Sequence, residues 1–144
     1  MLIRPQPIPT TRLTQITNDA CSSALATATS YDHASTKIWN DAIINFILKS
    51  LISESPSQAK YKFAVNSTII QHLSDPRSEG AEESDGVKKE NGVGEEGNKV
   101  GRRGMHSASG AYWNNERDGM WSHKFDGGEG KGMDIVVCVM WIAV

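Results

Sequence analysis

Hydrophobic residues recur every three or four positions in the first part of the chain and every second position after residue 60. The first periodic stretch follows Pro9, and Thr10 or Thr11 can cap a helix there. Its apolar stripe consists of Leu13, Ile16, Ala20, Ala24 and Ala28. Serines and threonines lower the helix propensity of this stretch, so we expect the helix to depend on tertiary packing.

A second helix is predicted more strongly. Ser35 can cap it, and Pro56 ends it because proline biases the preceding residue away from the helical conformation. Its apolar face consists of Ile38, Trp39, Ala42, Ile43, Phe46 and Ile47. Ile44, Leu48 and Leu51 widen this face beyond what a single sheet surface requires.

The period of two after residue 60 predicts four strands. They are expected at residues 60–70, 105–113, 120–125 and 133–144. The last is so continuously apolar that it should be central and covered on at least one face. The order of two helices and then four strands predicts an α+β fold, with the helices on one face of a four-stranded antiparallel sheet.

Residues 74–103 interrupt the pattern between the first two expected strands. They contain many acidic residues and glycines and few apolar side chains. Such a segment cannot bury enough apolar surface to offset the entropy of ordering, which predicts a disordered insert. Residues 1–9 contain three prolines and are expected to form a flexible tail. Residues 10–144 would then form one domain that the insert interrupts.

Composition excludes several classes of protein. The chain of 144 residues has a net charge of -2 and a pI of about 6.1, which gives no general attraction to nucleic acid or to an anionic membrane. The most apolar run, residues 135–144, is too short to cross a bilayer. Cys21 and Cys138 are far apart, which argues against a zinc site or a disulfide scaffold. We expect a soluble intracellular protein.

Candidate catalytic residues are few. His106 and Ser107, with Asp118 or Asp126, have the composition of a catalytic triad. An extended strand, however, places His106 and Ser107 on opposite faces, so they could not act together. The four histidines lack the spacing of metal ligands. We therefore expect no catalytic residue, no metal and no cofactor.

Two tryptophans have two interpretations that the sequence leaves open. Trp113 and Trp121 flank a turn at residues 114–119. A bulky aromatic residue in this position fits the core and an interface with a partner equally well.

Several short pieces of sequence occur in a distinctive order. They are YDHAS at 31–35 before Trp39, KYKFAV at 60–65 continuing through IIQ at 69–71, GMHSAS at 104–109 with AYW at 111–113, and Asp118-Gly119. In this order they resemble the Tctex-type dynein light chains, over about 110 residues. The chain departs from that family in the length of the connection at 74–103, which is usually short.

The resemblance implies a non-catalytic light chain of the cytoplasmic dynein motor complex, located on the microtubule cytoskeleton. It implies a homodimer that exchanges one strand between subunits and binds the dynein intermediate chain and, in some members, cargo peptides. The exchanged strand, which would also offer an edge to a peptide, corresponds to Met105, His106, Ser107, Ala108, Ser109, Gly110, Ala111, Tyr112 and Trp113.

Two other hypotheses remain open at this stage. The first is a Tctex-like dimeric scaffold that binds peptides outside the dynein motor. The second is an enzyme of an unrelated class, which would require a pocket with convergent polar groups around a residue such as His106.

Overall fold

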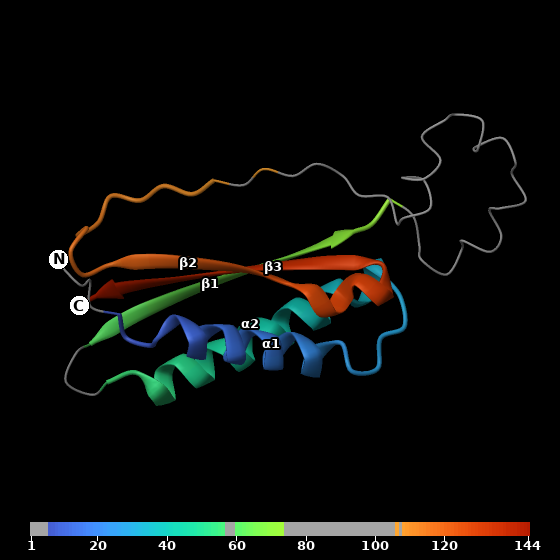
Figure 1. The fold of residues 1–144 in the computed structure, drawn as a ribbon, viewed down its shortest axis with the longest axis horizontal. Helices are drawn as coiled ribbons and strands as arrows, with labels where there is room; N and C mark the ends of the chain where they lie inside the picture. The colour runs from blue at the N-terminus through green and yellow to red at the C-terminus, as the bar shows by residue number, and fades with distance from the viewer. Residues whose placement is uncertain (1–5, 57–59, 74–105, 107) are drawn as a thin grey trace, which may run out of the picture.

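The computed structural model describes residues 6–56, 60–73, 106 and 108–144. Figure 1 shows two antiparallel helices packed on one face of a twisted antiparallel sheet, which confirms the α+β class. The elements are α1 (Thr10–Ala24), η1 (His33–Ser35), α2 (Thr36–Glu54), β1 (Tyr61–Gln71), β2 (Gly119–Phe125), η4 (Asp126–Lys131) and β3 (Met133–Ala143). The expected insert at 74–103 lies outside the described residues.

Among the described residues the sheet has three strands, in the order β1-β3-β2, and all neighbours are antiparallel. Tyr61 is opposite Ala143 at one end of the β1–β3 pair, and Gln71 is opposite Met133 at the other. β3 is therefore the central strand, as its continuous apolar sequence predicted.

The core lies between the helices and one face of the sheet. Every second residue of β3 points toward the helices and is buried, and these residues are Met133, Ile135, Val137, Val139 and Trp141. Opposite them, α2 contributes a buried row with a spacing of four residues: Trp39, Ile43, Ile47 and Leu51. The buried side chains of β3, which occur at every second residue, therefore face the buried row of α2, which recurs at every fourth residue.

The helices differ from the sequence-based expectations in their details. α1 begins at Thr10, with Pro9 in the capping position, so neither Thr10 nor Thr11 caps it. Ala28 lies beyond the end of α1. Within the predicted flexible tail at residues 1–9, residues 1–5 lie outside the described residues, and Pro7 and Ile8 are buried.

Only part of the predicted apolar face of α2 is buried. Ile38 is 69 % exposed and Phe46 is 38 % exposed, although both belong to the predicted face. α1 and β1 cover the row that includes Ile43 and Ile47. The apolar face of α2 is wider than the surface that these two elements cover, so the side chains at its margin stay exposed.

The second expected strand, at 105–113, is not a strand in the part of it that the structure describes. Residues 108–113 have no strand partner among the described residues, and the sheet has three strands where the sequence predicted four. A segment with such small side chains as Ala108, Ser109, Gly110 and Ala111 buries little apolar surface, so its pairing depends on finding a free sheet edge.

Candidate interaction site

Most of the described residues that the sequence assigned to partner binding lie on the surface. In Figure 1, the segment at 108–118 passes along the side of the sheet away from the helices and then turns into β2. His106 and residues 108–112 are exposed, and Tyr112 is fully so. Trp113 is half-buried, whereas Met105 and Ser107 lie outside the described residues.

β2 is an edge strand of this sheet. It pairs with β3 on one side, and no strand among the described residues pairs with its other side. An edge of this kind presents a row of unpaired backbone donors and acceptors that another extended segment can join. The segment 108–113 precedes this edge in the chain but does not form a ladder with it.

Asp118 holds the turn between that segment and β2. Asp118 is 6 % exposed, and its carboxylate accepts hydrogen bonds from the backbone amides of Asn114 at 2.9 Å and of Ala143 at 2.7 Å. Hydrogen bonds from amides to a buried carboxylate are charge-assisted and strong. Asp118 is thus a structural residue of the turn, and its carboxylate is engaged by backbone donors.

The face of the sheet away from the helices carries an apolar surface, which we call the outer strip. It consists of Ala64 from β1, Met120 from β2, and Val136, Cys138, Met140 and Ile142 from β3. No helix that the structure describes covers this strip, and Met120 and Ile142 are 41 % and 39 % exposed. Exposed apolar side chains that are neighbours on one face of a sheet are a candidate for contact with a partner.

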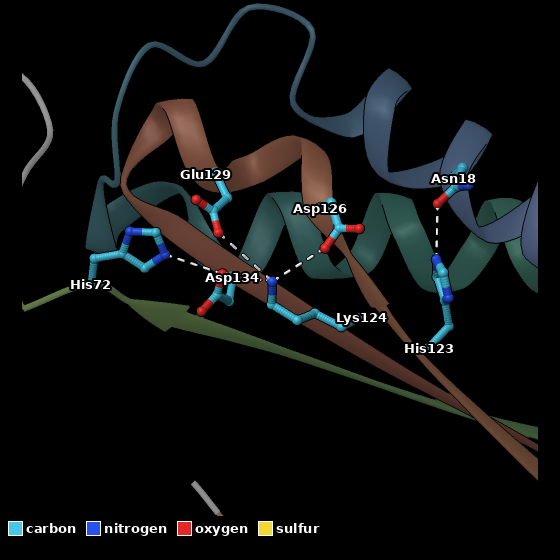
Figure 2. A network of polar contacts seen from close by, with 7 residues as sticks. All are labelled: Asn18, His72, His123, Lys124, Asp126, Glu129 and Asp134. Carbon is cyan, nitrogen blue, oxygen red and sulfur yellow. Dashed lines mark hydrogen bonds and ion pairs between the residues drawn. The ribbon is translucent and has the colours of Figure 1, made fainter. Parts of the chain in front are cut away.

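The other end of the sheet contains a polar network, which Figure 2 shows. The buried imidazole of His72 contacts Asp134 (Nε2 to Oδ1, 3.1 Å). The backbone amide of His72 donates to the carbonyl of Gly132 at 2.9 Å. The ammonium of Lys124 lies 3.5 Å from Asp134 and 3.2 Å from Asp126. These contacts tie the end of β1 to β3 and η4.

Additional polar contacts attach the helices to the sheet. His123 of β2 contacts Asn18 of α1 (Nε2 to Oδ1, 3.1 Å), as Figure 2 also shows. Lys131 donates from its ammonium to the carbonyl of Ala28 at 2.6 Å. These polar contacts join elements of the fold, and none of them places a nucleophile beside a base.

The structure does not bring the triad-like residues together in the described part of the chain. His106 is exposed, the carboxylate of Asp118 is engaged in the turn, and Asp126 of η4 contacts Lys124 of β2. Burial raises the pKa of the Cys21 thiol to about 12, which keeps it protonated and unreactive.

Among the described residues, no three His, Cys, Asp or Glu side chains lie close enough to hold a metal ion. No described helix has the length and apolar character needed to cross a membrane.

Sequence reasoning missed two of these features. The outer strip could have been found, because β3 is apolar at both its odd and its even positions. A strand of this kind in a sheet covered by helices on one face only must leave the other set of side chains open. The contact of Asp118 with Ala143 joins residues 25 positions apart, and no local pattern indicates it.

Comparison with known proteins adds the family. The model of the Tctex-1 family matches residues 7–142 of this chain. The chain is also 30 % identical, over 138 residues, to the protein "Dynein light chain Tctex-type" of Schizosaccharomyces pombe. That alignment covers 96 % of this chain and 97 % of the yeast protein.

Proposed function

The chain belongs to the Tctex-1 family, and from this premise we propose that it is a non-catalytic dynein light chain, a dimeric adaptor in microtubule-based transport. In this role it binds the dynein intermediate chain and cargo peptides in the cytoplasm, as part of the motor complex. The observation that carries the proposal is an unpaired segment, 108–113, beside a sheet whose β2 edge is open, in a chain of this family.

The homodimer is supported by two surfaces of the described residues. The segment 108–113 of one copy has the length to pair with the β2 edge of another copy, which would complete a fourth strand. The outer strip would be covered at the same time if the two sheets face each other. Apolar side chains such as Met120 and Met140 then leave water, which favours association.

Peptide binding follows from the same geometry. When segment 108–113 pairs with β2 of the partner copy, its other side becomes the new edge of that sheet. An extended peptide can add there as a further strand, with affinity from main-chain hydrogen bonds. The small side chains of Ser109, Gly110 and Ala111 allow close approach of its backbone.

The test combines light scattering with titration calorimetry on the full chain. We expect a dimer in solution and heat of binding when a peptide of the dynein intermediate chain is added. A peptide of the same composition in scrambled order is the control. A monomer at all concentrations would reject the homodimer, and absence of heat at high micromolar peptide would reject intermediate-chain binding.

A matched pair of variants locates the binding strand. Ala111→Pro removes a backbone donor from the middle of the segment, so we expect it to weaken both dimer and peptide binding. Thr29→Pro, at an exposed loop position after α1 whose amide donates to no carbonyl among the described residues, adds a proline far from the segment and is the control for global effects. Equal binding by both variants would place the partner elsewhere.

Purification from cells tests membership in the motor. A subunit of the motor brings the heavy and intermediate chains with it. A dimer that is recovered with other peptides but without these chains would instead be a Tctex-like scaffold outside the dynein motor.

A further inference from the structure

At the end of the ladder between β2 and β3, the side chain of Asp118 takes the place of a main-chain hydrogen-bond acceptor. Gly119 is opposite Trp141, so the next hydrogen-bonded position along the ladder would place residue 117 opposite Ala143. The amide of Val144 donates to Lys60 on the β1 side, and amide directions alternate along a strand, so the amide of Ala143 points toward β2. It donates there to Oδ1 of Asp118, at 2.7 Å, where the carbonyl of residue 117 would be if β2 continued.

The second oxygen of this carboxylate acts on the turn before β2. The carbonyl of Asn114 accepts a hydrogen bond from the amide of Asp118 at 2.9 Å, which is one half of the pair that closes a hairpin with a three-residue loop. The other half would be a bond from the amide of Asn114 to the main-chain carbonyl of Asp118. That amide donates instead to Oδ2 of Asp118, at 2.9 Å.

The residue after Asp118 keeps this arrangement in place. A Cβ atom at Gly119 would lie 2.4 Å from Cζ2 of Trp141, so the buried indole packs directly on the backbone there. The side-chain oxygen of Asn114 accepts from the amide of Glu116 at 2.9 Å and braces the loop from inside. The turn is therefore held at both ends.

We propose that Asp118 is a positioning residue that keeps segment 108–113 off the β2 edge of its own chain and so reserves this edge for a second copy. The loop length alone would permit an intramolecular hairpin, since connections of this size are common between paired strands. The carboxylate prevents it because it captures the amide that would start the hairpin ladder. This proposal rests on the homodimer proposed above.

The test uses the full chain and measures the dissociation constant of the dimer by sedimentation velocity. In Asp118→Ala the amide of Asn114 is free to bond the main-chain carbonyl, so the chain closes its own hairpin and we expect the constant to rise by about tenfold or more. Asp118→Asn retains one acceptor oxygen and should give a smaller rise. Asp126→Asn removes an exposed carboxylate on η4 and should leave the constant unchanged.

Hydrogen exchange of residues 108–113 distinguishes this mechanism from general damage to the turn. In the wild type, we expect their amides to gain protection as protein concentration rises. In Asp118→Ala they should be protected at every concentration, because the partner strand is in the same chain. Protection that is lost at every concentration would overturn the proposal, since it would show a damaged turn without a hairpin.

The remaining outcomes separate this proposal from the proposed function. A dissociation constant unchanged in both Asp118 variants would overturn the role of Asp118 and leave the homodimer standing. A wild type that is monomeric throughout would overturn both. If Asp118→Ala does not fold, the comparison of Asp118→Asn with Asp126→Asn decides the question.

Discussion

The two faces of β3 have similar apolar character but different surroundings. On the helix side, Ile135, Val137 and Val139 are completely buried, whereas Val136 and Met140 on the other face are only partly covered. Burial of an aliphatic side chain stabilises a protein by about 1.5–3 kcal/mol, so covering the exposed face of β3 would add substantial stabilisation. The difference indicates that the helix side maintains the fold and that the outer strip is available for association.

The largest effect should come from the helix side. Ile135→Ala creates a cavity in a packed core and should lower the free energy of unfolding by about 2–5 kcal/mol, measured by urea denaturation. Val136→Ala, one position along the strand, should cost less than about 1 kcal/mol in dilute protein. Equal losses would show that the two faces are not different in the isolated chain.

The outer strip gives the next effect, on association. Met140→Lys places a charge in the middle of this strip, and we expect the dissociation constant of the dimer to rise by about tenfold or more, since burying an unpaired charge is costly. The unfolding midpoint in dilute protein should change little, because Met140 does not contact the core below the helices. A dimer that tolerates this lysine would exclude the outer strip from the interface.

The helix side contains one defect whose repair should stabilise the protein. The hydroxyl of Thr17 in α1 is buried and has no hydrogen-bond partner among the residues that the structure describes. Thr17→Val keeps the shape and removes the unsatisfied group, so we expect a gain of about 1 kcal/mol in unfolding free energy. The hydroxyl of Thr14 donates to the carbonyl of Thr10, so Thr14→Val is the control and should not stabilise the protein. A loss of stability in Thr17→Val would show that the hydroxyl has a bonding role.

The smallest effect concerns the surface of the helix layer. The guanidinium of Arg12 on α1 donates twice to the carboxylate of Glu54 on α2, at 2.8 and 2.7 Å, and these hydrogen bonds lower the pKa of Glu54. Because the folded pKa lies below the unfolded one, the pair stabilises the fold above the unfolded pKa. Its contribution is lost as pH falls through the folded pKa.

The corresponding measurement is thermal unfolding as a function of pH. Arg12→Gln should lower the unfolding midpoint slightly at neutral pH, and this difference should disappear in acid, where Glu54 is protonated in both proteins. Lys37→Gln, in an exposed pair within α2, is the matched control for loss of a surface cation. A difference between Arg12→Gln and wild type that persists in acid would assign the effect to packing of the Arg12 side chain.

The elements that sequence reasoning predicted best were those defined by local patterns. The apolar run at 133–144 predicted the central strand, and the buried row that includes Ile43 and Ile47 was within the predicted face of α2. Burial of Ile8 could not be predicted, because it depends on contacts with a core formed by distant segments. Exposure of Ile38 likewise depends on which neighbours cover the helix.

The candidate site was only partly accessible to such reasoning. Resemblance identified the segment that contains residues 108–113, whereas its pairing depends on a sheet edge and not on its own composition. Asp118 was noted as part of a turn, but its contact with Ala143 is made across the fold. A local pattern specifies a turn and says nothing about the donors that a distant strand brings to it.

The anchoring of His72 also has a practical consequence. Its amide and its imidazole both bond to the segment around β3, so β1 ends at a fixed point just before residue 73. An insertion after this point does not pull on β1. Each doubling of the length of a loop costs only about 0.6 kcal/mol in closure entropy. The position after Leu73 is therefore the natural place to insert a fluorescent protein or an affinity tag, which would report on the light chain without disturbing its sheet.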